Sequence, residues 1–252
     1  MKIALFSDIH GNLPALEAVL ADIDTHDADV CYCLGDLVNF APWPNEVIAL
    51  LRARRIAVVQ GNHDLGIGQH LPDFPFSFRS MVEQAAGWQA LAATNAALTD
   101  DNRAYLRALP HNIRLDAGGP PPYLRVVLTH GSPADVNRYI QQDHDAADLL
   151  RLMHTHAADV LCMGHTHRPY HRVLPGRAGF RHALNLGSVG RPKDGDPRAA
   201  WCLLELTETS SVAVADSVRV QLHRVAYDYP RTVAAIRASA IPALYADALT
   251  QA

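Results

Sequence analysis

The chain has 252 residues, of which 49% are hydrophobic and 19% are charged, and its formal net charge is −4. These values are typical of a globular protein with a large core, and the weak negative charge argues against extended nucleic acid as a partner. No apolar run reaches the roughly 18 residues of a membrane span, so we expect no membrane contact and a cytoplasmic location. Because no linker-like stretch interrupts the chain, residues 1–252 are predicted to form a single domain.

Short apolar runs alternate with amphipathic helical patterns in the first third of the chain. In order, these segments are Ile3–Phe6, Leu13–Ile23, Val30–Leu34, Asn45–Arg54 and Ile56–Val59. The alternation is that of a βαβαβ unit, which predicts a parallel sheet. The glycines and prolines of residues 65–80 then predict a loop.

The middle of the chain is predicted to be mainly helical, followed by a hairpin. Residues 81–109 have a helical pattern in which Asp100 or Asp101 is the expected cap of a second segment. The turn-forming residues 118–122 separate two short strand patterns and so predict a hairpin. The two strand patterns are Ile113–Leu115 and Tyr123–Leu128. A predicted helix over residues 143–156 and a predicted strand, Val160–Cys162, follow them.

From Pro169 onward, strand patterns follow one another without helices between them. They are Tyr170–Leu174, His182–Asn185, Trp201–Leu206, Val212–Val214 and Val218–Val225. This succession predicts a second sheet that is mainly antiparallel. The alanine-rich tail, from Tyr229 to Ala248, is predicted to be helical with a break at Pro242.

The cysteines and most of the histidines are interpreted as structural. The four cysteines lie in or beside apolar strand patterns, so buried free thiols are favoured over a metal site. Of the 14 histidines, nine lie outside any motif and are interpreted as surface or internally satisfied side chains. The five that lie in motifs are His10, His63, His130, His165 and His167.

A compact polar cluster follows each of five predicted strands. The clusters contain Asp8 and His10, Asp36, Asn62 and His63, His130, and His165 and His167. Ligands of open α/β sheets bind outside the carboxyl ends of the strands, so these five strand ends predict one shared site. The alternative is that the residues serve as turn and capping residues, which is the role expected of Asn12 before the first helix. Turn chemistry does not call for histidine, and we therefore favour the shared site.

The side chains of this predicted site suit transition metals. Imidazole, carboxylate and one amide oxygen form a mixed nitrogen and oxygen set, which favours Mn, Fe, Zn or Co over Ca or Mg. Seven ligands exceed what one ion takes from side chains. The set therefore predicts two divalent or trivalent transition-metal ions that share one carboxylate.

The order of the clusters resembles that of the calcineurin-like metallophosphoesterase superfamily. The matching motifs are Asp8-Ile9-His10, Gly35-Asp36, Gly61-Asn62-His63-Asp64, His130-Gly131 and Gly164-His165-Thr166-His167. Further segments, such as residues 185–190, are similar to its small bacterial branch of phosphodiesterases and diadenosine-polyphosphate hydrolases. The resemblance implies an α/β fold in which a two-sheet sandwich is flanked by helices, with the metal site at the C-terminal ends of the strands.

The resemblance also implies a role for each motif residue. One metal would be held by Asp8, His10, Asp36 and His167, and the other by Asp36, Asn62, His130 and His165. We expect the side chains of His165 and His167, two residues apart in backbone taken as extended, to diverge and to serve different ions. His63 is not an implied ligand, which leaves it available to protonate a leaving oxygen.

The chain departs from the family's protein phosphatases after Asp36. Those enzymes read G-D-x-V-D-R-G, whereas this chain has Asn39 and Phe40 in place of the second aspartate and the arginine. The carboxylate that would orient the catalytic histidine is therefore missing, and a phosphoprotein substrate is disfavoured. Leu186 stands where the small branch usually has proline, which affects the local loop.

The sequence thus predicts hydrolysis of a phosphodiester or dinucleoside polyphosphate by a hydroxide that bridges two metal ions. The expected partner is a small phosphorylated molecule, with nucleotides among the candidates, and the oligomeric state is not indicated. Arg191 and Lys193 are interpreted as solvated surface charges rather than substrate contacts. The alternatives are a phosphomonoesterase with the same centre, a non-catalytic scaffold like the retromer subunit of this fold, or a metal-binding regulatory module.

Overall fold

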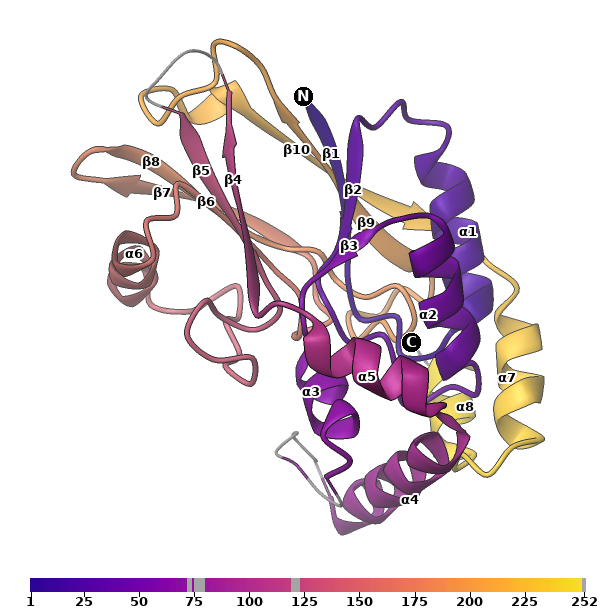
Figure 1. Cartoon of the computed structure of the whole chain (residues 1–252). Coiled ribbons are helices and arrows are strands. Elements are labelled where there is room, and N and C mark those ends of the chain that lie inside the picture. Colours follow the sequence, from indigo (N-terminus) through magenta and orange to yellow (C-terminus); the bar gives the residue numbers. More distant parts are fainter. Residues whose placement is uncertain (72–73, 75–79, 119–122, 251–252) are drawn as a thin grey trace.

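The computed structural model describes residues 1–71, 74, 80–118 and 123–250. Two five-stranded sheets lie at its centre with helices outside them (Figure 1). The first sheet has the order β10 (Val218–Val225), β9 (Ala199–Leu206), β1 (Lys2–Phe6), β2 (Val30–Cys33) and β3 (Ala57–Val58). The second has the order β4 (Asn112–Ala117), β5 (Leu124–Thr129), β6 (Val160–Met163), β8 (Gly179–Asn185) and β7 (Tyr170–Gly176). This arrangement confirms the predicted two-sheet α/β fold.

Both sheets are mixed. Strands β1, β2 and β3 are parallel, whereas β9 is antiparallel to β1 and β10 is antiparallel to β9. In the second sheet, β5, β6 and β8 are parallel, and the outer strands β4 and β7 are antiparallel to their neighbours. The predicted antiparallel second sheet was therefore wrong in its membership, because β9 and β10 return to the first sheet.

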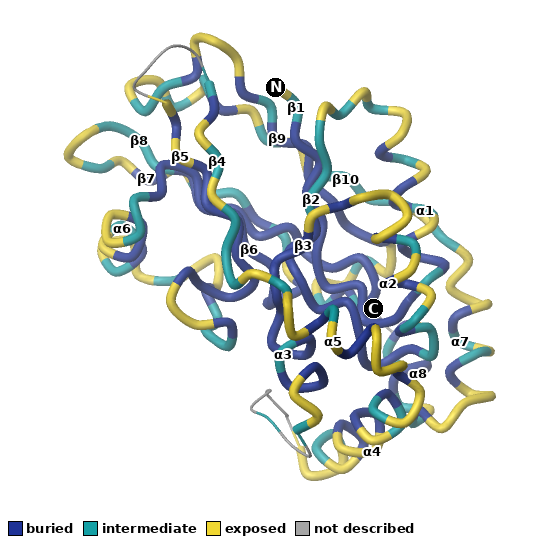
Figure 2. Tube along the Cα trace, viewed as in Figure 1, coloured by how far each residue is buried: buried dark blue, intermediate teal, exposed yellow. Residues whose placement is uncertain are grey.

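Alternation along the strands divides the core into layers. In β1, Ile3 and Leu5 face the second sheet, while Ala4 and Phe6 face the helices that cover the first. The covering helices are α1 (Leu13–Ile23), α2 (Pro44–Ala53) and α5 (Asp100–Ala108), and α6 (Ala146–Thr155) covers the second sheet. The inner strands β1, β5, β6, β8 and β9 are accordingly buried over most of their length, whereas the edge strands β4, β7 and β10 are largely half-buried or exposed. Most other exposed residues lie in outer loops and outward helix faces (Figure 2).

The remaining helices gather at one end of the sheets, near the carboxyl ends of the parallel strands (Figure 1). They are α3 (Asn62–Gly68), α4 (Met81–Ala97), α7 (Tyr229–Arg237) and α8 (Leu244–Thr250), and a short 3-10 turn, Ala215–Ser217, precedes β10. Among the described residues, no helix is both long and apolar enough to cross a membrane.

Several local predictions need correction. The first residues of the predicted loop over 65–80 belong to helix α3, in which Gly66 lies against the Phe74 ring with no room for a side chain. Thr99, and not Asp100 or Asp101, caps α5 by accepting a hydrogen bond from the Asn102 amide. The segment 212–214 is not a strand. The predicted turn at 118–122 falls mostly outside the described residues.

Other local predictions are confirmed. Asn12 caps α1 by accepting from the Ala15 amide at 3.3 Å. All four cysteines are free thiols; Cys31 is half-buried, and the buried ones are Cys33, Cys162 and Cys202.

Candidate metal centre

The motif residues meet where strands of both sheets end. Asp8 and His10 follow β1, Asp36 follows β2, and Asn62 opens helix α3 after β3, while His130, His165 and His167 follow β5 and β6. The two sheets are joined here by a hydrogen bond of 3.0 Å from the His165 amide to Asp8 Oδ2. The shared site predicted from five strand ends is therefore one place in the structure, and all of its residues are buried.

The backbone of this site is bent sharply. Five of the site residues have positive φ, namely Asp8, His10, Asp36, His165 and His167. Left-handed backbone is uncommon for residues other than glycine, and such strain concentrates at functional sites. The prediction that His165 and His167 diverge because they are extended had the wrong reason. Side chains two apart in a strand share a face, and both residues have left-handed backbone instead.

Two motif glycines allow the loops to approach closely. A Cβ atom on Gly61 would lie 2.2 Å from Asp36 Oδ1, and one on Gly164 would lie 2.1 Å from Ser7 Oγ. Neither space admits a side chain, so the sequence needs glycine at these positions for packing beside the carboxylates.

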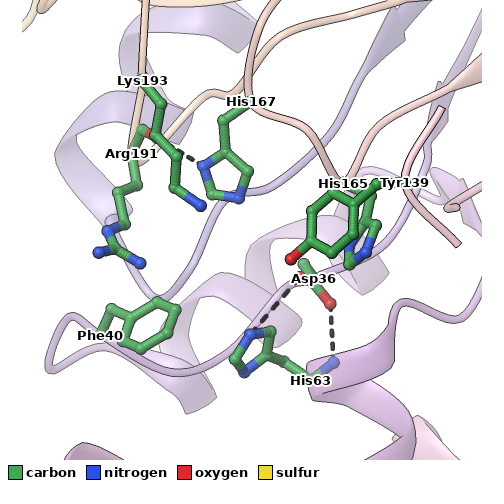
Figure 3. A pocket seen from close by; sticks show the side chains of 8 residues that line it. All are labelled: Asp36, Phe40, His63, Tyr139, His165, His167, Arg191 and Lys193. Atoms are coloured by element: carbon green, nitrogen blue, oxygen red, sulfur yellow. Dashed lines mark hydrogen bonds and ion pairs between the residues drawn. The ribbon is translucent and has the colours of Figure 1, made fainter. Parts of the chain in front are cut away.

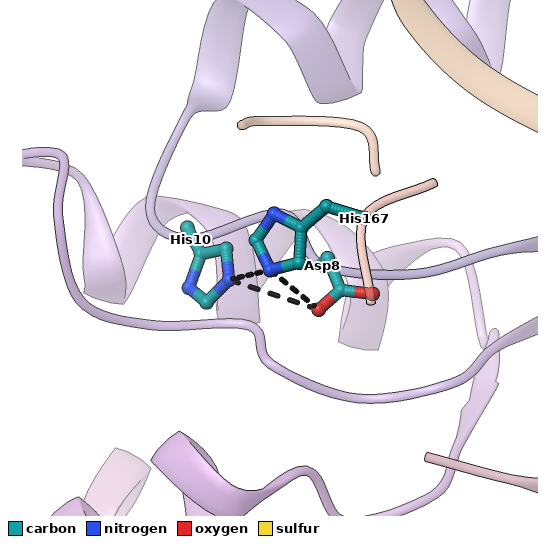
Figure 4. Close-up of side chains that lie close together, drawn as sticks. All are labelled: Asp8, His10 and His167. Carbon is teal, nitrogen blue, oxygen red and sulfur yellow. Dashed lines mark hydrogen bonds and ion pairs between the residues drawn. The ribbon is translucent and has the colours of Figure 1, made fainter. Parts of the chain in front are cut away.

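The first group of candidate ligands is Asp8, His10 and His167 (Figure 4). The Nε2 atoms of His10 and His167 are 3.2 Å apart. Asp8 Oδ1 lies 3.2 Å from His167 Nε2 and 3.7 Å from His10 Nε2. Each ring places its Nδ1 against a backbone carbonyl, that of Val38 or Arg191. A carbonyl only accepts, so Nδ1 carries the hydrogen in both neutral rings and the two Nε2 lone pairs face each other.

The second group is Asp36, His130 and His165, with Asn62 beside it. His130 Nε2 lies 3.3 Å from Asp36 Oδ2 and 3.1 Å from both Asn62 Oδ1 and His165 Nδ1. The other ring nitrogens again face backbone carbonyls. His130 Nδ1 faces the Leu34 carbonyl, and His165 Nε2 faces the Asn137 carbonyl. His130 Nε2 and His165 Nδ1 are therefore the atoms available as ligands.

Asp36 lies between the two groups. Its Oδ2 is 3.6 Å from His10 Nε2 in the first group and 3.3 Å from His130 Nε2 in the second. Its Oδ1 accepts a hydrogen bond of 2.9 Å from the His63 amide, which holds the carboxylate in place. Asp36 is thus placed as a carboxylate shared by the two groups would be.

The donor set fits metal cations. Facing lone pairs repel one another unless a cation lies between them, and buried polar atoms normally have partners. Asp8 Oδ1 is buried at the same place and has no hydrogen-bond partner in the described part of the chain. A cation coordinated by these atoms would satisfy both the nitrogen pairs and the orphaned oxygen.

The pKa shifts keep most of these groups in the form that binds metal. Burial lowers the pKa values of His10 and His167, and it lowers the pKa of His165 to about 3. Burial opposes ionisation of Asp36, but the nearby imidazoles of His130 and His63 hold its pKa below the usual range. Burial also opposes ionisation of His130, but the nearby Asp36 carboxylate outweighs it and raises the pKa of His130 to about 9.

His63 differs from the other imidazoles of the site. Its Nδ1 lies 3.1 Å from the Asn39 side-chain nitrogen, and its Nε2 lies 4.0 Å from Asp36 Oδ2. The Asn39 amide is oriented because its oxygen accepts from the Phe40 amide and the Thr94 hydroxyl. Asn39 therefore donates to Nδ1, and the neutral His63 ring carries its hydrogen on Nε2, toward the centre. Although His10, Asp36 and His63 are close enough to form a ligand group, this tautomer disfavours His63 as a ligand.

Asp64 is a site residue whose role the sequence did not reveal. Its carboxylate is buried and accepts hydrogen bonds from the backbone amides of Asp36, Leu37 and Gly61, at 2.8, 2.9 and 3.0 Å. These bonds tie the turn after β2 to the start of α3. Burial, together with Asp36, raises the pKa of Asp64 to about 7.

A small pocket opens above the centre (Figure 3). It is lined by Asp36, Phe40, His63, Tyr139, His165, His167, Arg191 and Lys193. Tyr139 stacks on His165 with ring centroids 3.9 Å apart. The interpretation of Arg191 and Lys193 as solvated surface charges was wrong, because both line this pocket and the Arg191 side chain is only 16% exposed.

Comparisons with known proteins agree with this geometry. The calcineurin-like phosphoesterase superfamily domain matches residues 1–209. Phosphodiesterase YfcE of Escherichia coli is 28% identical over 229 residues, covering 86% of this chain and 94% of its own. A metallophosphoesterase from Sphaerobacter thermophilus has a solved structure with a TM-score of 0.73 and 30% identity, covering 100% of this chain and 98% of its own. A hypothetical protein from Pyrococcus horikoshii, 21% identical with a TM-score of 0.80 over 98% and 97% of the two chains, shares the fold. The chain therefore belongs to the calcineurin-like phosphoesterase superfamily and is a phosphoric ester hydrolase.

Proposed function

We propose that this chain hydrolyses phosphodiesters, dinucleoside polyphosphates included, at a centre of two transition-metal ions. The observation that carries the proposal is the pair of ligand groups that share Asp36, in each of which two imidazole nitrogens lie within 3.2 Å of each other. A diester substrate is supported by the relative named as a phosphodiesterase. The chain is further proposed to act as a single domain in the cytoplasm, which limited proteolysis and cell fractionation test.

The proposed ligands are those of the two groups. Asp8, His10, Asp36 and His167 would hold one ion, and Asp36, Asn62, His130 and His165 the other. Their imidazole and oxygen atoms suit Mn, Fe, Zn or Co. When bound, two such ions supply positive charge opposite a phosphate and lower the pKa of a coordinated water, which provides the nucleophile.

His63 is proposed as the proton donor to the leaving oxygen. Its Nε2 carries the hydrogen and is directed toward the centre, because Asn39 donates to Nδ1. Burial lowers the pKa of His63 to about 4, so the ring is neutral before substrate binds. An anionic phosphate beside the ring favours its protonated form, and the proton can then pass to the departing alkoxide.

Arg191 is proposed to bind a phosphate oxygen in the pocket. Its guanidinium lies 4.5 Å from the centroid of the Phe40 ring and 3.6 Å from Glu83, so several neighbours limit its movement. A guanidinium that is already oriented loses less entropy when it binds an oxyanion. Arg191 would thus serve in place of the arginine that the motif after Asp36 lacks.

A substrate screen at equal metal loading tests the proposal. Bis-p-nitrophenyl phosphate and diadenosine tetraphosphate should be hydrolysed faster than p-nitrophenyl phosphate. A clear preference for the last compound would favour a monoesterase, and no turnover of any of them would favour a scaffold or regulatory module. Chelation should abolish hydrolysis, and Mn²⁺ should restore it better than Ca²⁺ because calcium prefers oxygen ligands. Equal rescue by Ca²⁺ would contradict the ligand set.

A further inference from the structure

A larger groove adjoins the pocket above the metal centre. Its volume is about 640 Å³, and it is lined by Ser80, Glu83, Arg168, Arg191, Pro192, Lys193, Gly195, Leu244, Asp247 and Ala248. Arg191 and Lys193 line both the pocket and the groove, so the two spaces adjoin. Ligand sites of small molecules have volumes of roughly 300–1,000 Å³, and the groove is therefore large enough for a nucleotide-sized group.

Helix α8 forms one wall of the groove and lies outside the residues that match the family domain, 1–209. It holds Arg191 as well, since the guanidinium lies 5.0 Å from the centroid of the Tyr245 ring. The Phe40 ring lies beside Tyr245, with centroids 4.6 Å apart, and 4.5 Å from the same guanidinium. The C-terminal helix thus shapes the space next to the reaction centre without supplying a metal ligand.

The charge of the groove favours an anion. Three cationic side chains line it, against the two carboxylates of Glu83 and Asp247. Both carboxylates already have cationic partners, Arg191 at 3.6 Å and Arg237 at 2.9 Å. Arg168 donates from Nε to the Lys193 carbonyl at 3.0 Å, which ties two segments of the groove wall together. The rest of this guanidinium is the strongest candidate for contact with a ligand.

We propose that this groove binds one of the two groups esterified to the attacked phosphate, and that this group is nucleotide-sized and carries a further phosphate. The inference rests on the proposed function, since it concerns the substrate of the same centre. Guanidinium groups bind phosphate through two parallel hydrogen bonds, which makes Arg168 the residue that recognises the distal phosphate. Although Asp247 is paired with Arg237, its carboxylate lines the groove, so the part of its charge that this pair leaves uncompensated lowers the affinity for that phosphate.

Calorimetry with two product-like ligands tests the groove directly. Thymidine 5′-monophosphate and thymidine 3′,5′-bisphosphate differ only in the distal phosphate, and both can be titrated into the metal-loaded protein. The bisphosphate should bind about tenfold more tightly, as expected for one charge-assisted phosphate contact. Equal affinity of the two ligands would overturn the proposal.

Two variants that should change the affinity advantage of the bisphosphate in opposite directions separate phosphate recognition from structural damage. Arg168→Gln should abolish the advantage of the bisphosphate, whereas Asp247→Asn should increase that advantage two- to threefold. Arg219→Gln, an exposed arginine on β10, is the matched control and should keep the tenfold advantage. An advantage that persists in Arg168→Gln, with metal content unchanged, would also overturn the proposal.

The outcome can be told apart from failure of the proposed function. Hydrolysis of bis-p-nitrophenyl phosphate by the wild-type protein, together with equal binding of the two thymidine ligands, would reject the groove alone. If the protein hydrolyses no diester but binds the bisphosphate more tightly in a way that depends on Arg168, the proposed reaction is rejected and the proposed phosphate site in the groove stands.

Discussion

Two groups of side chains in this molecule have the same composition but different surroundings. Asp8, His10 and His167 form one, and Asp22, His26 and His223 form the other; in each, a carboxylate and two imidazoles place ligand atoms within 4.8 Å of one another. The first group is buried where strands end. The second is half-buried on α1, the turn after it and β10, with His26 and Asp22 side chains 30% and 33% exposed.

Hydrogen bonding distinguishes the groups more sharply than composition does. In the second group, Trp201 Nε1 donates to Asp22 Oδ2 at 2.8 Å, and the His26 and His223 rings meet edge to face with centroids 4.6 Å apart. In the first, Asp8 Oδ1 has no such donor among the described residues, and the nitrogen lone pairs converge. A metal centre therefore requires lone pairs that are directed inward and left unsatisfied, and the residue types alone do not make one.

The largest loss of metal and activity, and so the clearest difference between the two groups, is expected from Asp36→Asn. The amide keeps the shape but removes the negative charge between the two ligand groups, so metal should be lost from both. Activity should fall by about 10³-fold or more, since the ions supply several kcal/mol of charge stabilisation. Metal analysis and diester hydrolysis measure the two effects. Asp22→Asn is the matched control and should retain both ions, while an Asp36→Asn protein with full metal and activity would refute the shared carboxylate.

His63→Ala should separate proton transfer from metal binding. Loss of a proton donor typically costs about 10²- to 10⁴-fold when the leaving oxygen is strongly basic, as in nucleoside or alkyl esters. A p-nitrophenolate group hardly needs a proton, so esters of that phenol should retain much more activity. Metal content should stay at the wild-type level, because the hydrogen on Nε2 disfavours ligation. A uniform loss of rate on both ester classes, or a loss of metal, would remove His63 from this role.

The sequence predicts the fold well wherever the pattern is local. The first strand, the helix after it and the Asn12 cap depend on periodicity and on neighbours close in sequence, and all were predicted. The sheet to which β9 belongs depends on pairing with β1, about 200 residues away. Its apolar residues indicate only that it is buried on both faces, where Trp201 packs in one core layer and Cys202 in the other.

The site shows the same division between local and distant information. Motif order brought the proposed ligands to notice, because each follows a strand directly. Asn39 and Arg191 were missed because their roles depend on partners distant in the chain, Thr94 for the first and Tyr245 for the second. Asp64 stood in a motif, but its three backbone donors become visible only when two loops are packed together.

Acid should destabilise the metal-free protein mainly through His63 and His165, buried imidazoles of the metal centre, and only weakly through the half-buried group. Burial lowers the pKa of His63 to about 4 and that of His165 to about 3. Unfolding restores values near 6.5, so below that pH the unfolded chain binds protons that the folded chain does not, and stability falls with pH. At about pH 5 each ring should cost roughly 2 kcal/mol of unfolding free energy. Denaturant titrations near pH 7 and pH 5 measure this loss.

His223→Gln is the matched control for this pH dependence. The variant should lose nearly as much stability between the two pH values as the wild type does, and the small difference reflects His223 itself, whose pKa burial also lowers. His130 offsets part of this loss, because Asp36, against the effect of burial, raises its pKa to about 9. The folded ring is therefore protonated at both pH values, whereas the unfolded ring becomes protonated only as the pH falls through about 6.5. Stability that does not change between pH 7 and pH 5 would show that the buried rings are accessible to protons without unfolding.

The smallest change in stability is expected from the same His223→Gln substitution at neutral pH. This variant tests most directly whether the half-buried group differs from the metal centre. His223 stacks on Trp201 with centroids 4.2 Å apart, and its buried Nε2 has no hydrogen-bond partner among the described residues. Loss of the stack should lower the unfolding free energy by about 0.5–1.5 kcal/mol, while metal content and diester hydrolysis stay at wild-type values. Metal analysis and denaturant titration beside His154→Gln, an exposed histidine on α6, measure both quantities. A loss of one ion per chain from His223→Gln alone would show that Nε2 binds a metal and that the two groups are alike in function.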